Sequence, residues 1–373
     1  MPPRSHLQQV KRAVVKVGSA VVAPGGSLDE TAIARLVDDA SGLHARGISI
    51  TIVSSGAVAA GFRALGMTSM PRAIRDKQAA AAVGQPALVR RYADLFAQRS
   101  IPVAQVLLTG DVLDHRGRFL NARHTLTTLL ERGVVPIVNE NDSVTHDEIK
   151  LGDNDRLSAL VAGLVNADAL VILSSVDGLY EAGDAARRIE TCTDTAAARA
   201  HVTGDASSTG TGGFATKLDA VDIARAHAVP TVITRGPTDE RPAPIAAALA
   251  GEPVGTLFPL PEAGSARGAR KNWIAHSTAP RGIIHVDAGA ARALTQRGAS
   301  LLPKGITRVE GTFDAGAVVT IVGESGAPIA RGLTNYNSAD LATLAGKRTD
   351  EIEATLGYTY ADEAVHRDDM VVL

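Results

Sequence analysis

The chain has 373 residues, of which 45% are hydrophobic and 3% aromatic, and its formal net charge is −2. This near balance of charge excludes a general electrostatic attraction to nucleic acid or anionic membranes, and the hydrophobic content excludes wholesale disorder. The single cysteine, Cys192, excludes an intramolecular disulfide and a zinc site built from cysteines.

No apolar run approaches the ~20 residues that a transmembrane helix needs. The polar N-terminal segment MPPRSHLQQVKR also lacks the apolar stretch of a secretory signal. We therefore expect a cytoplasmic protein with no membrane partner. Its length exceeds the ~100–200 residues of a typical domain, which predicts one large domain and one small one.

Short apolar segments predict the strands of a sheet that is buried on both faces. In chain order they are AVVKV (13–17), ISITIV (48–53), IPVAQVLL (101–108), VVPIV (134–138), ALVIL (169–173) and PTVIT (230–234). Helix-length segments separate them, and in one of these Leu157, Leu160, Val161 and Leu164 recur at helical spacing. This alternation predicts an α/β fold, with a mostly parallel sheet and helices on both faces.

The pattern changes after residue 258. The segment FPLPEAGSARGARKNW has little periodicity and is typical of a linker. Beyond it, GIIHVD, a short helix near 288–297, TRVEGTF, AVVTIVG and PIARGLT predict a small, strand-rich module. We therefore predict a domain at 1–262, a linker at 263–279 and a second domain at 280–373.

Lys16 stands in the apolar stretch AVVKVGSAVV, at 13–22. A solvated lysine on an edge strand would explain it. The alternative is that a core strand carries the charge to a reaction centre, because Gly18 marks the end of the strand two residues later.

Polar or glycine-rich stretches follow four of the predicted strands: KVGSA, VSSGAVAAG, NENDS and SSVDGLY. Each alone is typical of a turn. Ligands collect beyond the carboxyl ends of strands in open α/β sheets, so the recurrence favours a common site. Within VSSGAVAAG, Ser54 and Ser55 are candidates to cap the helix that follows, and Gly56 allows a ligand to approach the backbone.

The densest polar stretch is NENDSVTHDEIKLGDNDRLSAL. Asn154 or Asp153 as a helix N-cap would account for one polar residue, but the stretch also holds Asn139, Glu140, Asn141, Asp142, Asp147, Glu148 and Asp155. Such a cluster suits binding of an ammonium group, or the ordering of lysines around a phosphate. The spacing of an EF-hand loop is absent.

A second glycine-rich stretch, STGTGGFATK, leads into a helix whose buried side is marked by Leu218, Val221, Ala224 and Ala228. Gly212, Gly213 and the helix start are suited to phosphate oxygens, and Lys217 adds a positive charge. Thr216 before the lysine excludes a Walker A loop, and the position late in the chain excludes a dinucleotide fingerprint. A flexible surface loop is the alternative.

In their order along the chain these stretches resemble the amino-acid kinase family, in particular its members that phosphorylate the γ-carboxylate of L-glutamate. The resemblance rests on VVKVGSAVV, IVSSGAVAAG, KQAAAAVGQ, FLNARHTL, VPIVNENDSV, EIKLGDNDRLSAL, GTGGFATKL, SLLPKGI, YNSADL and AVHRDDM. It implies an αβα sandwich around a mostly parallel eight-stranded sheet, followed by a C-terminal PUA-like domain. The implied reaction uses ATP and Mg²⁺ to make L-glutamyl 5-phosphate, the first step of proline biosynthesis.

The resemblance also implies a role for individual residues. The catalytic residues would be Lys16 on the transferring phosphoryl group, Lys217 on the nucleotide phosphates, and Asp155, which holds both lysines in place. Glutamate would be bound by Ser55, Gly56, Asn139, Asp142 and Asn154, with Asp142 on the ammonium group. The nucleotide would be bound by Lys16, Gly18, Ser19, Ser174, Ser175, Thr211, Gly212, Gly213, Phe214, Ala215, Thr216 and Lys217. Family members often carry Thr-Asp where this chain has Ser174-Ser175, so one carboxylate is missing, and no Mg²⁺ ligand is identified.

As partners, the resemblance implies a homo-oligomer, coupling to glutamyl-phosphate reductase and feedback inhibition by proline. PUA domains often bind RNA, but residues 264–373 hold twelve basic and twelve acidic residues, which favours a structural or regulatory role. Two alternatives stay open: a related kinase for another carboxylate or carbamate, and an RNA-binding protein with an inactive kinase-like domain.

Overall fold

The computed structural model describes residues 4–109, 116–144, 154–181, 184–202, 213–260 and 280–373, and the chain divides into two compact units. The first comprises the residues up to Val112 and Thr125–Ala266, and the second comprises Leu113–His124 and Arg267–Leu373. The predicted linker at 263–279 lies outside the described residues, so the domain boundaries stay a prediction.

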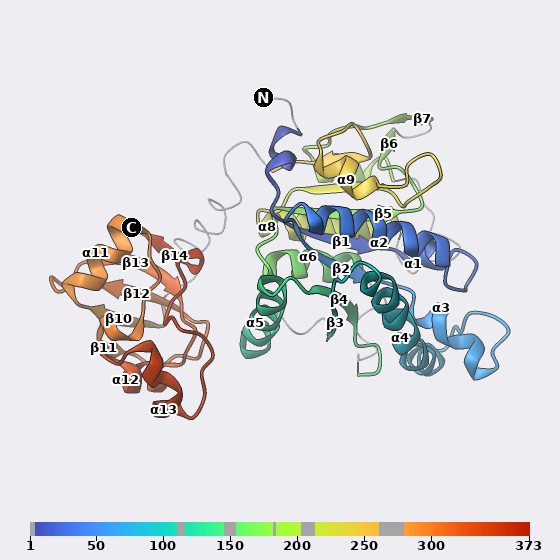
Figure 1. Ribbon diagram of the computed structural model, residues 1–373. Helices are drawn as coiled ribbons and strands as arrows, with labels where there is room; N and C mark the ends of the chain where they lie inside the picture. The colour runs from blue at the N-terminus through green and yellow to red at the C-terminus, as the bar shows by residue number, and fades with distance from the viewer. Residues whose placement is uncertain (1–3, 110–115, 145–153, 182–183, 203–212, 261–279) are drawn as a thin grey trace. The chain divides into compact units, whose positions relative to one another are not determined.

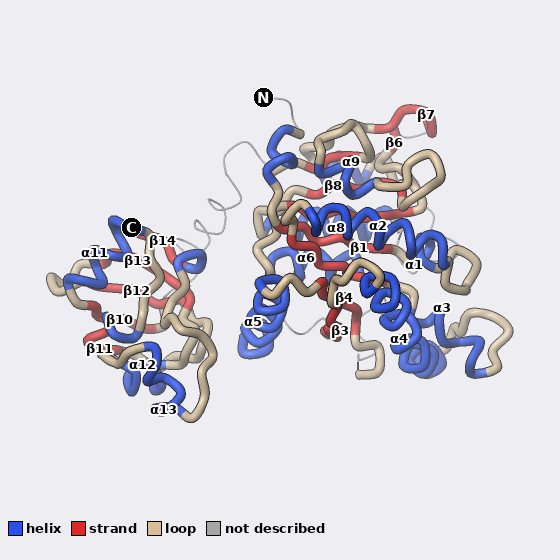
Figure 2. Tube along the Cα trace, viewed as in Figure 1, coloured by secondary structure: helices blue, strands red, loops and turns tan. Residues whose placement is uncertain are grey.

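A seven-stranded sheet with the order β3-β4-β2-β1-β5-β8-β9 forms the centre of the first unit (Figures 1 and 2). Its strands are β1 (Arg12–Val17), β2 (Ser49–Ser54), β3 (Val103–Leu108), β4 (Val135–Glu140), β5 (Ala169–Ser174), β8 (Thr231–Arg235) and β9 (Thr256–Phe258). All pairs are parallel except β8 with β9. The α/β class and all six predicted strands are confirmed. The described residues give seven strands where the resemblance implied eight, and the short β9 was not predicted.

The helices of this unit are α1 (Ser19–Val22), α2 (Glu30–Ala45), α3 (Ala57–Gly61), α4 (Ile74–Ala97), α6 (Asn154–Leu164), α7 (Thr195–Arg199), α8 (Phe214–Ala226) and α9 (Pro244–Leu249), while α5 (Arg116–Glu131) spans the division between the units. Short 3-10 helices cover Ser5–Gln9 and Phe62–Leu65, and β6 (Tyr180–Glu181) pairs with β7 (Asp184–Arg188) as a separate ribbon. Helix α6 begins three residues before the predicted segment, and Leu160 is partly exposed while Leu157, Val161 and Leu164 are buried.

Helices pack on both faces of the sheet, and alternation along β1 decides which face each side chain meets. Val15 and Val17 lie in one apolar core with α2, α4 and α9. Lys16, between them, points to the opposite face, where α6 packs against β1 and α8. The sequence of β1 therefore directs one charge towards α6 and α8.

Helices α3 and α4 cross in close contact, with a glycine of each helix at the crossing point. A Cβ atom added at Gly61 would lie 2.0 Å from the carbonyl oxygen of Ala80, and one at Gly84 would lie 1.9 Å from that of Ala57. Only glycine allows the two backbones to approach so closely. The crossing fixes the start of α3, directly after Ser55 and Gly56, against the middle of α4.

We expect Gly84→Ala to destabilise the protein strongly, because the added methyl group meets backbone rather than a movable side chain. Overpacking of this kind costs about 3 kcal/mol. Gly42→Ala is the matched control: Gly42 lies inside α2 with no atom within 4 Å of the added Cβ, so it should gain up to about 1 kcal/mol from helix propensity. Urea unfolding of both variants measures the two changes, and equal stabilities would contradict the crossing.

The second unit contains a five-stranded sheet with the order β11-β10-β12-β13-β14. Its elements are β10 (Gly282–Val286), α11 (Ala288–Arg297), β11 (Ile306–Glu310), β12 (Val318–Val322), β13 (Pro328–Leu333), α12 (Ser338–Leu344), α13 (Ile352–Leu356) and β14 (Met370–Val372), with 3-10 helices at Pro303–Gly305, Thr349–Glu351 and Arg367–Asp369. Ile284, Val319, Ile321 and Leu341 share its apolar core. The predicted strand-rich module and its helix at 288–297 are confirmed.

Candidate active site

Lys16 lies on the central strand of the sheet. Strand β1 pairs with β2 on one side and with β5 on the other, and Lys16 is only 6% exposed. The interpretation as a solvated lysine on an edge strand is therefore wrong. A charge buried in this way needs a compensating group.

That group is Asp155, in the first turn of α6. The Lys16 ammonium forms an ion pair with Asp155 Oδ1, and Lys217 Nζ from α8 lies 3.2 Å from Asp155 Oδ2. Thr216 donates a hydrogen bond of 2.9 Å to the same Oδ2. All three charged side chains are at least 90% buried. Residues far apart in the sequence thus converge on one carboxylate.

The charges in this cluster determine the ionisation of Asp155. Burial alone would raise the pKa of its carboxyl, but the two ammonium groups, with hydrogen bonds from Lys16 and Thr216, lower the pKa to about 2. Two lysines and one ionised aspartate leave one net positive charge. The cluster therefore attracts an anion while its two ammonium groups stay at fixed positions.

A chain of side-chain hydrogen bonds lies beside the charged cluster. The amide of Asn154 donates to Ser55 Oγ at 2.9 Å and to Asn139 Oδ1 at 3.0 Å. The capping role predicted for Ser54 and Ser55 is wrong: the N-cap of α3 is Gly56, with φ of 109° and no side-chain cap bond. The Ser54 hydroxyl instead bonds to the buried Tyr92. Asn154 is the first residue of α6, and its side chain reaches across to β2 and β4 rather than capping its own helix.

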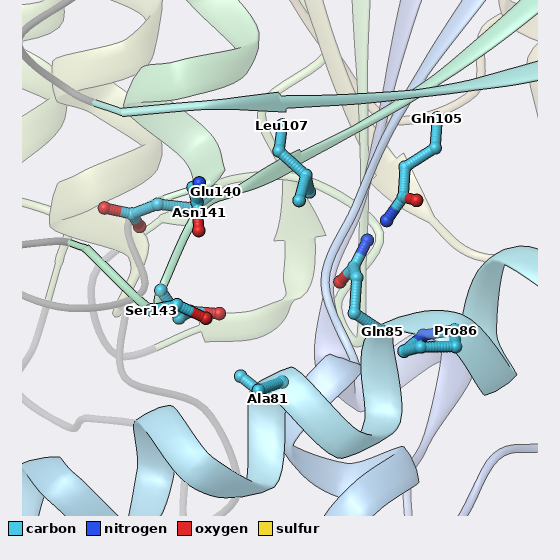
Figure 3. A pocket seen from close by; sticks show the side chains of 10 residues that line it. Ala81, Gln85, Pro86, Gln105, Leu107, Glu140, Asn141 and Ser143 are labelled. Atoms are coloured by element: carbon cyan, nitrogen blue, oxygen red, sulfur yellow. The ribbon is translucent and has the colours of Figure 1, made fainter.

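A pocket of about 280 Å³ opens between α4 and the ends of β3 and β4 (Figure 3). Its lining is Ala81, Ala82, Gln85, Pro86, Gln105, Leu107, Glu140, Asn141, Asp142 and Ser143. Burial and the neighbouring Glu140 raise the pKa of Asp142 to about 6. The described lining carries two carboxyl groups and no lysine or arginine, which suits a cation such as an ammonium group.

The remaining predicted residues that the structure describes lie directly after β1, at the end of β5 and at the start of α8. Gly18 directly follows β1 as the N-cap of α1, and a Cβ atom added to it would lie 3.5 Å from Lys16 Nζ. Ser19 begins α1. Ser174 ends β5 and is buried, while Ser175 is exposed. Gly213 is the N-cap of α8, which Phe214, Ala215, Thr216 and Lys217 continue. Thr211 and Gly212 lie outside the described residues, as do Asp147, Glu148 and Asp153.

Two residues with structural importance for the site received no role from the sequence. Gln85 bonds to Asn139 at 2.8 Å and lines the pocket. Asp177 accepts hydrogen bonds of 2.8 Å from both Thr234 and Arg241, and Arg188 lies 2.9 Å from its carboxylate. Asp177 stands in SSVDGLY, so this polar stretch after β5 holds a carboxylate that anchors the loop to the end of β8. The only sign of Asp177 in the sequence was the position of its polar stretch directly after a predicted strand.

Comparisons with known proteins identify the family and the second domain. Residues 11–235 match the amino acid kinase family, and residues 282–356 match the PUA domain. The chain is 48% identical to a glutamate 5-kinase of Trichlorobacter lovleyi, over 99% of each chain. It is 49% identical to one of Geobacter sulfurreducens, over 98% of this chain and 99% of the relative. A glutamate 5-kinase of Pelobacter propionicus is 46% identical, over 99% of this chain and its own whole length.

Proposed function

The chain belongs to the amino acid kinase family, and from this premise we propose that it transfers the γ-phosphoryl group of ATP to the γ-carboxylate of L-glutamate, forming L-glutamyl 5-phosphate. This is the first step of proline biosynthesis. The observation that carries the proposal is the convergence of Lys16 and Lys217 on Asp155, next to a pocket suited to an ammonium group.

The reaction explains why the site has two lysines and needs no general base. The attacking group is a carboxylate with a pKa of ~4.3, which is already ionised at neutral pH. The difficulty is electrostatic, because an anion approaches a polyanion and charge spreads over the phosphoryl oxygens during transfer. Lys16 would contact the transferring group from the end of β1, and Lys217 the nucleotide phosphates from α8. Asp155 would hold both ammonium groups at fixed positions, so that they need not reorganise during the reaction.

The nucleotide would lie along Gly18, Ser19 and the start of α8. The backbone N–H groups of the first turn of α8, which follow the N-cap Gly213, suit phosphate oxygens. Ser174 and Ser175 would offer hydroxyl groups from the end of β5. Thr211 and Gly212, which precede this turn, complete the proposed nucleotide loop.

Magnesium would neutralise part of the phosphate charge when bound with ATP. Within the described ranges, no three histidine, cysteine or acidic side chains come together to hold a metal ion. Asp155 is engaged by two lysines. We therefore propose that Mg²⁺ is held chiefly by the phosphates and by water.

Glutamate would be held by Ser55, Gly56, Asn139, Asp142 and Asn154. Asp142 would pair with the α-ammonium group. Asn139 and Asn154 would order the region between this pocket and the lysines.

One assay tests the function. The protein is incubated with ATP, Mg²⁺ and hydroxylamine, and the hydroxamate formed from any acyl phosphate is measured with L-glutamate, L-aspartate and carbamate as acceptors. We expect hydroxamate with L-glutamate. Its absence from folded protein would refute the proposal, and a signal with another acid alone would identify a related kinase.

The pKa of Asp142 predicts how glutamate binding depends on pH. A carboxyl with a raised pKa of about 6 loses its charge as the pH falls through that value. The KM for glutamate should therefore be constant above about pH 7 and rise by about tenfold per unit below pH 6. In Asp142→Asn the KM should be high and independent of pH over this range. The KM for ATP is the internal control, and a variant with the wild-type pH profile would contradict this role.

The partners implied by the resemblance stay predictions: a homo-oligomer, coupling to glutamyl-phosphate reductase and inhibition by proline. The same holds for a structural or regulatory role of the PUA domain, for the expectation that nucleic acid is not a partner, and for a cytoplasmic location. In the part of the chain that the structure describes, no helix combines the length and apolar character needed to cross a membrane.

A further inference from the structure

Gln85, in the middle of α4, ends a chain of hydrogen bonds whose direction is fixed. A backbone N–H can only donate, and that of Glu140 donates to Asn139 Oδ1 at 2.9 Å. Asn139 Nδ2 must then be the donor of the 2.8 Å bond to Gln85, and Gln85 Oε1 the acceptor. The amide nitrogen of Gln85 is thus left as a donor.

In the part of the chain that the structure describes, this donor has no acceptor. Gln85 is 8% exposed, and its Nε2 is buried with no hydrogen-bond acceptor among the described residues. Leaving an amide group buried and unpaired is unfavourable, unless a ligand completes the hydrogen bond. At the other end of the same chain, Asn154 Oδ1 is a buried acceptor with no donor among the residues that the structure describes. A donor at one end of the chain of hydrogen bonds and an acceptor at the other suit a ligand that carries a negatively and a positively charged group.

The unpaired donor belongs to the pocket that holds Asp142. Figure 3 shows the Gln85 amide pointing away from α4, towards Gln105 on the opposite wall. The neighbouring Pro86 has no N–H group for the carbonyl of Ala82, and both residues line the same pocket. The helix therefore presents side-chain and backbone polar groups here.

We propose that Gln85 Nε2 donates a hydrogen bond to the α-carboxylate of the amino-acid substrate, while Asp142 pairs with its α-ammonium group. The inference rests on the proposed function and assigns the recognition of the substrate's head group. The described lining of the pocket has two carboxyl groups and no basic side chain, so a substrate carboxylate must find a neutral donor. Gln85 is the best fixed candidate, because Asn139 holds its amide in one orientation and Gln105 is exposed.

Two substitutions distinguish hydrogen-bond donation by Gln85 to the substrate from a purely structural support of Asn139. Gln85→Glu keeps an acceptor for Asn139 Nδ2 and removes the donor, whereas Gln85→Met removes both. At about pH 8, where a carboxyl is normally ionised, kcat/KM for L-glutamate should fall by about 10- to 100-fold in Gln85→Met and further in Gln85→Glu. If Gln85 only supports Asn139, Gln85→Glu should instead be the milder change.

Substrate analogues locate the contact on the substrate. 4-Aminobutyrate lacks the α-carboxylate, so its kcat/KM should change by less than about threefold in both Gln85 variants. Glutarate keeps both carboxylates and lacks the ammonium group, so it should remain sensitive to Gln85 and become insensitive to Asp142→Asn. Equal losses with glutamate and 4-aminobutyrate would overturn the assignment.

A matched control and a binding measurement complete the test. Gln98, exposed at the C-cap of the same helix, serves for the control Gln98→Glu, which should behave as wild type. Thermal stabilisation by L-glutamate should be lost in Gln85→Glu, and stabilisation by ATP retained. If the wild-type protein forms no hydroxamate with glutamate, the proposed function fails. If it does, and Gln85→Glu keeps its kcat/KM, the function stands and only this inference is wrong.

Discussion

Replacing Lys16 or Lys217 with alanine should lower kcat by about 10³-fold in the glutamate-dependent assay, and should leave the protein folded. Each lysine supplies one of the two ammonium groups that Asp155 holds in the buried cluster. Charge that develops on the phosphoryl oxygens in a buried site is stabilised more strongly than in water, so the loss falls mainly on kcat. The remaining lysine still compensates Asp155, which is why unfolding is not expected.

The controls address both parts of this expectation. Lys11 is exposed directly before β1, and Lys11→Ala should keep the wild-type kcat. Circular dichroism and thermal melting of the Lys16 and Lys217 variants should show a cooperative native state. Wild-type rates in either variant would remove the role assigned to that lysine.

The sequence predicted the strands of the large sheet well, because segments such as ALVIL at 169–173 are apolar on both sides and bounded by turn residues. It also indicated which polar residues belong together, because the carboxyl ends of parallel strands meet at one edge. The order of the strands in the sheet could not be predicted from the sequence. Whether Lys16 lies on an edge or a central strand depends on pairing between β1, β2 and β5, which are far apart in the sequence.

Local rules failed where tertiary contacts replaced them. Ser54 and Ser55 have the chemistry of N-caps, but Tyr92 and Asn154 offer them partners from other helices. Gln85 lies in the alanine-rich segment KQAAAAVGQ, where the sequence shows only helix propensity. Its importance arises from contact with Asn139 across the sheet edge, and no periodicity along α4 reveals that contact.

Asp155→Asn should be the most destabilising single substitution in the charged cluster. It removes the charge that compensates two buried ammonium groups and leaves them close to each other and to a neutral amide. Breaking a buried ion pair in this way costs about 3–5 kcal/mol of unfolding free energy. Because both lysines lose their anchor, kcat should also fall by about 10²- to 10³-fold.

The pH dependence of stability distinguishes this electrostatic loss from a loss of packing. The pKa of Asp155 is lowered from 3.8 to about 2 in the folded protein, so its charge stabilises the fold above pH 3.8 and that contribution disappears as the pH falls through about 2. Wild type and Asp155→Asn should therefore differ most near neutral pH, and the difference should shrink below about pH 4. Urea unfolding over this range measures it, with the exposed Asp94→Asn as a control that should show little change. A difference between wild type and Asp155→Asn that stays constant down to low pH would mean that the substitution acts through shape, and that the charge of Asp155 does not hold the two lysines.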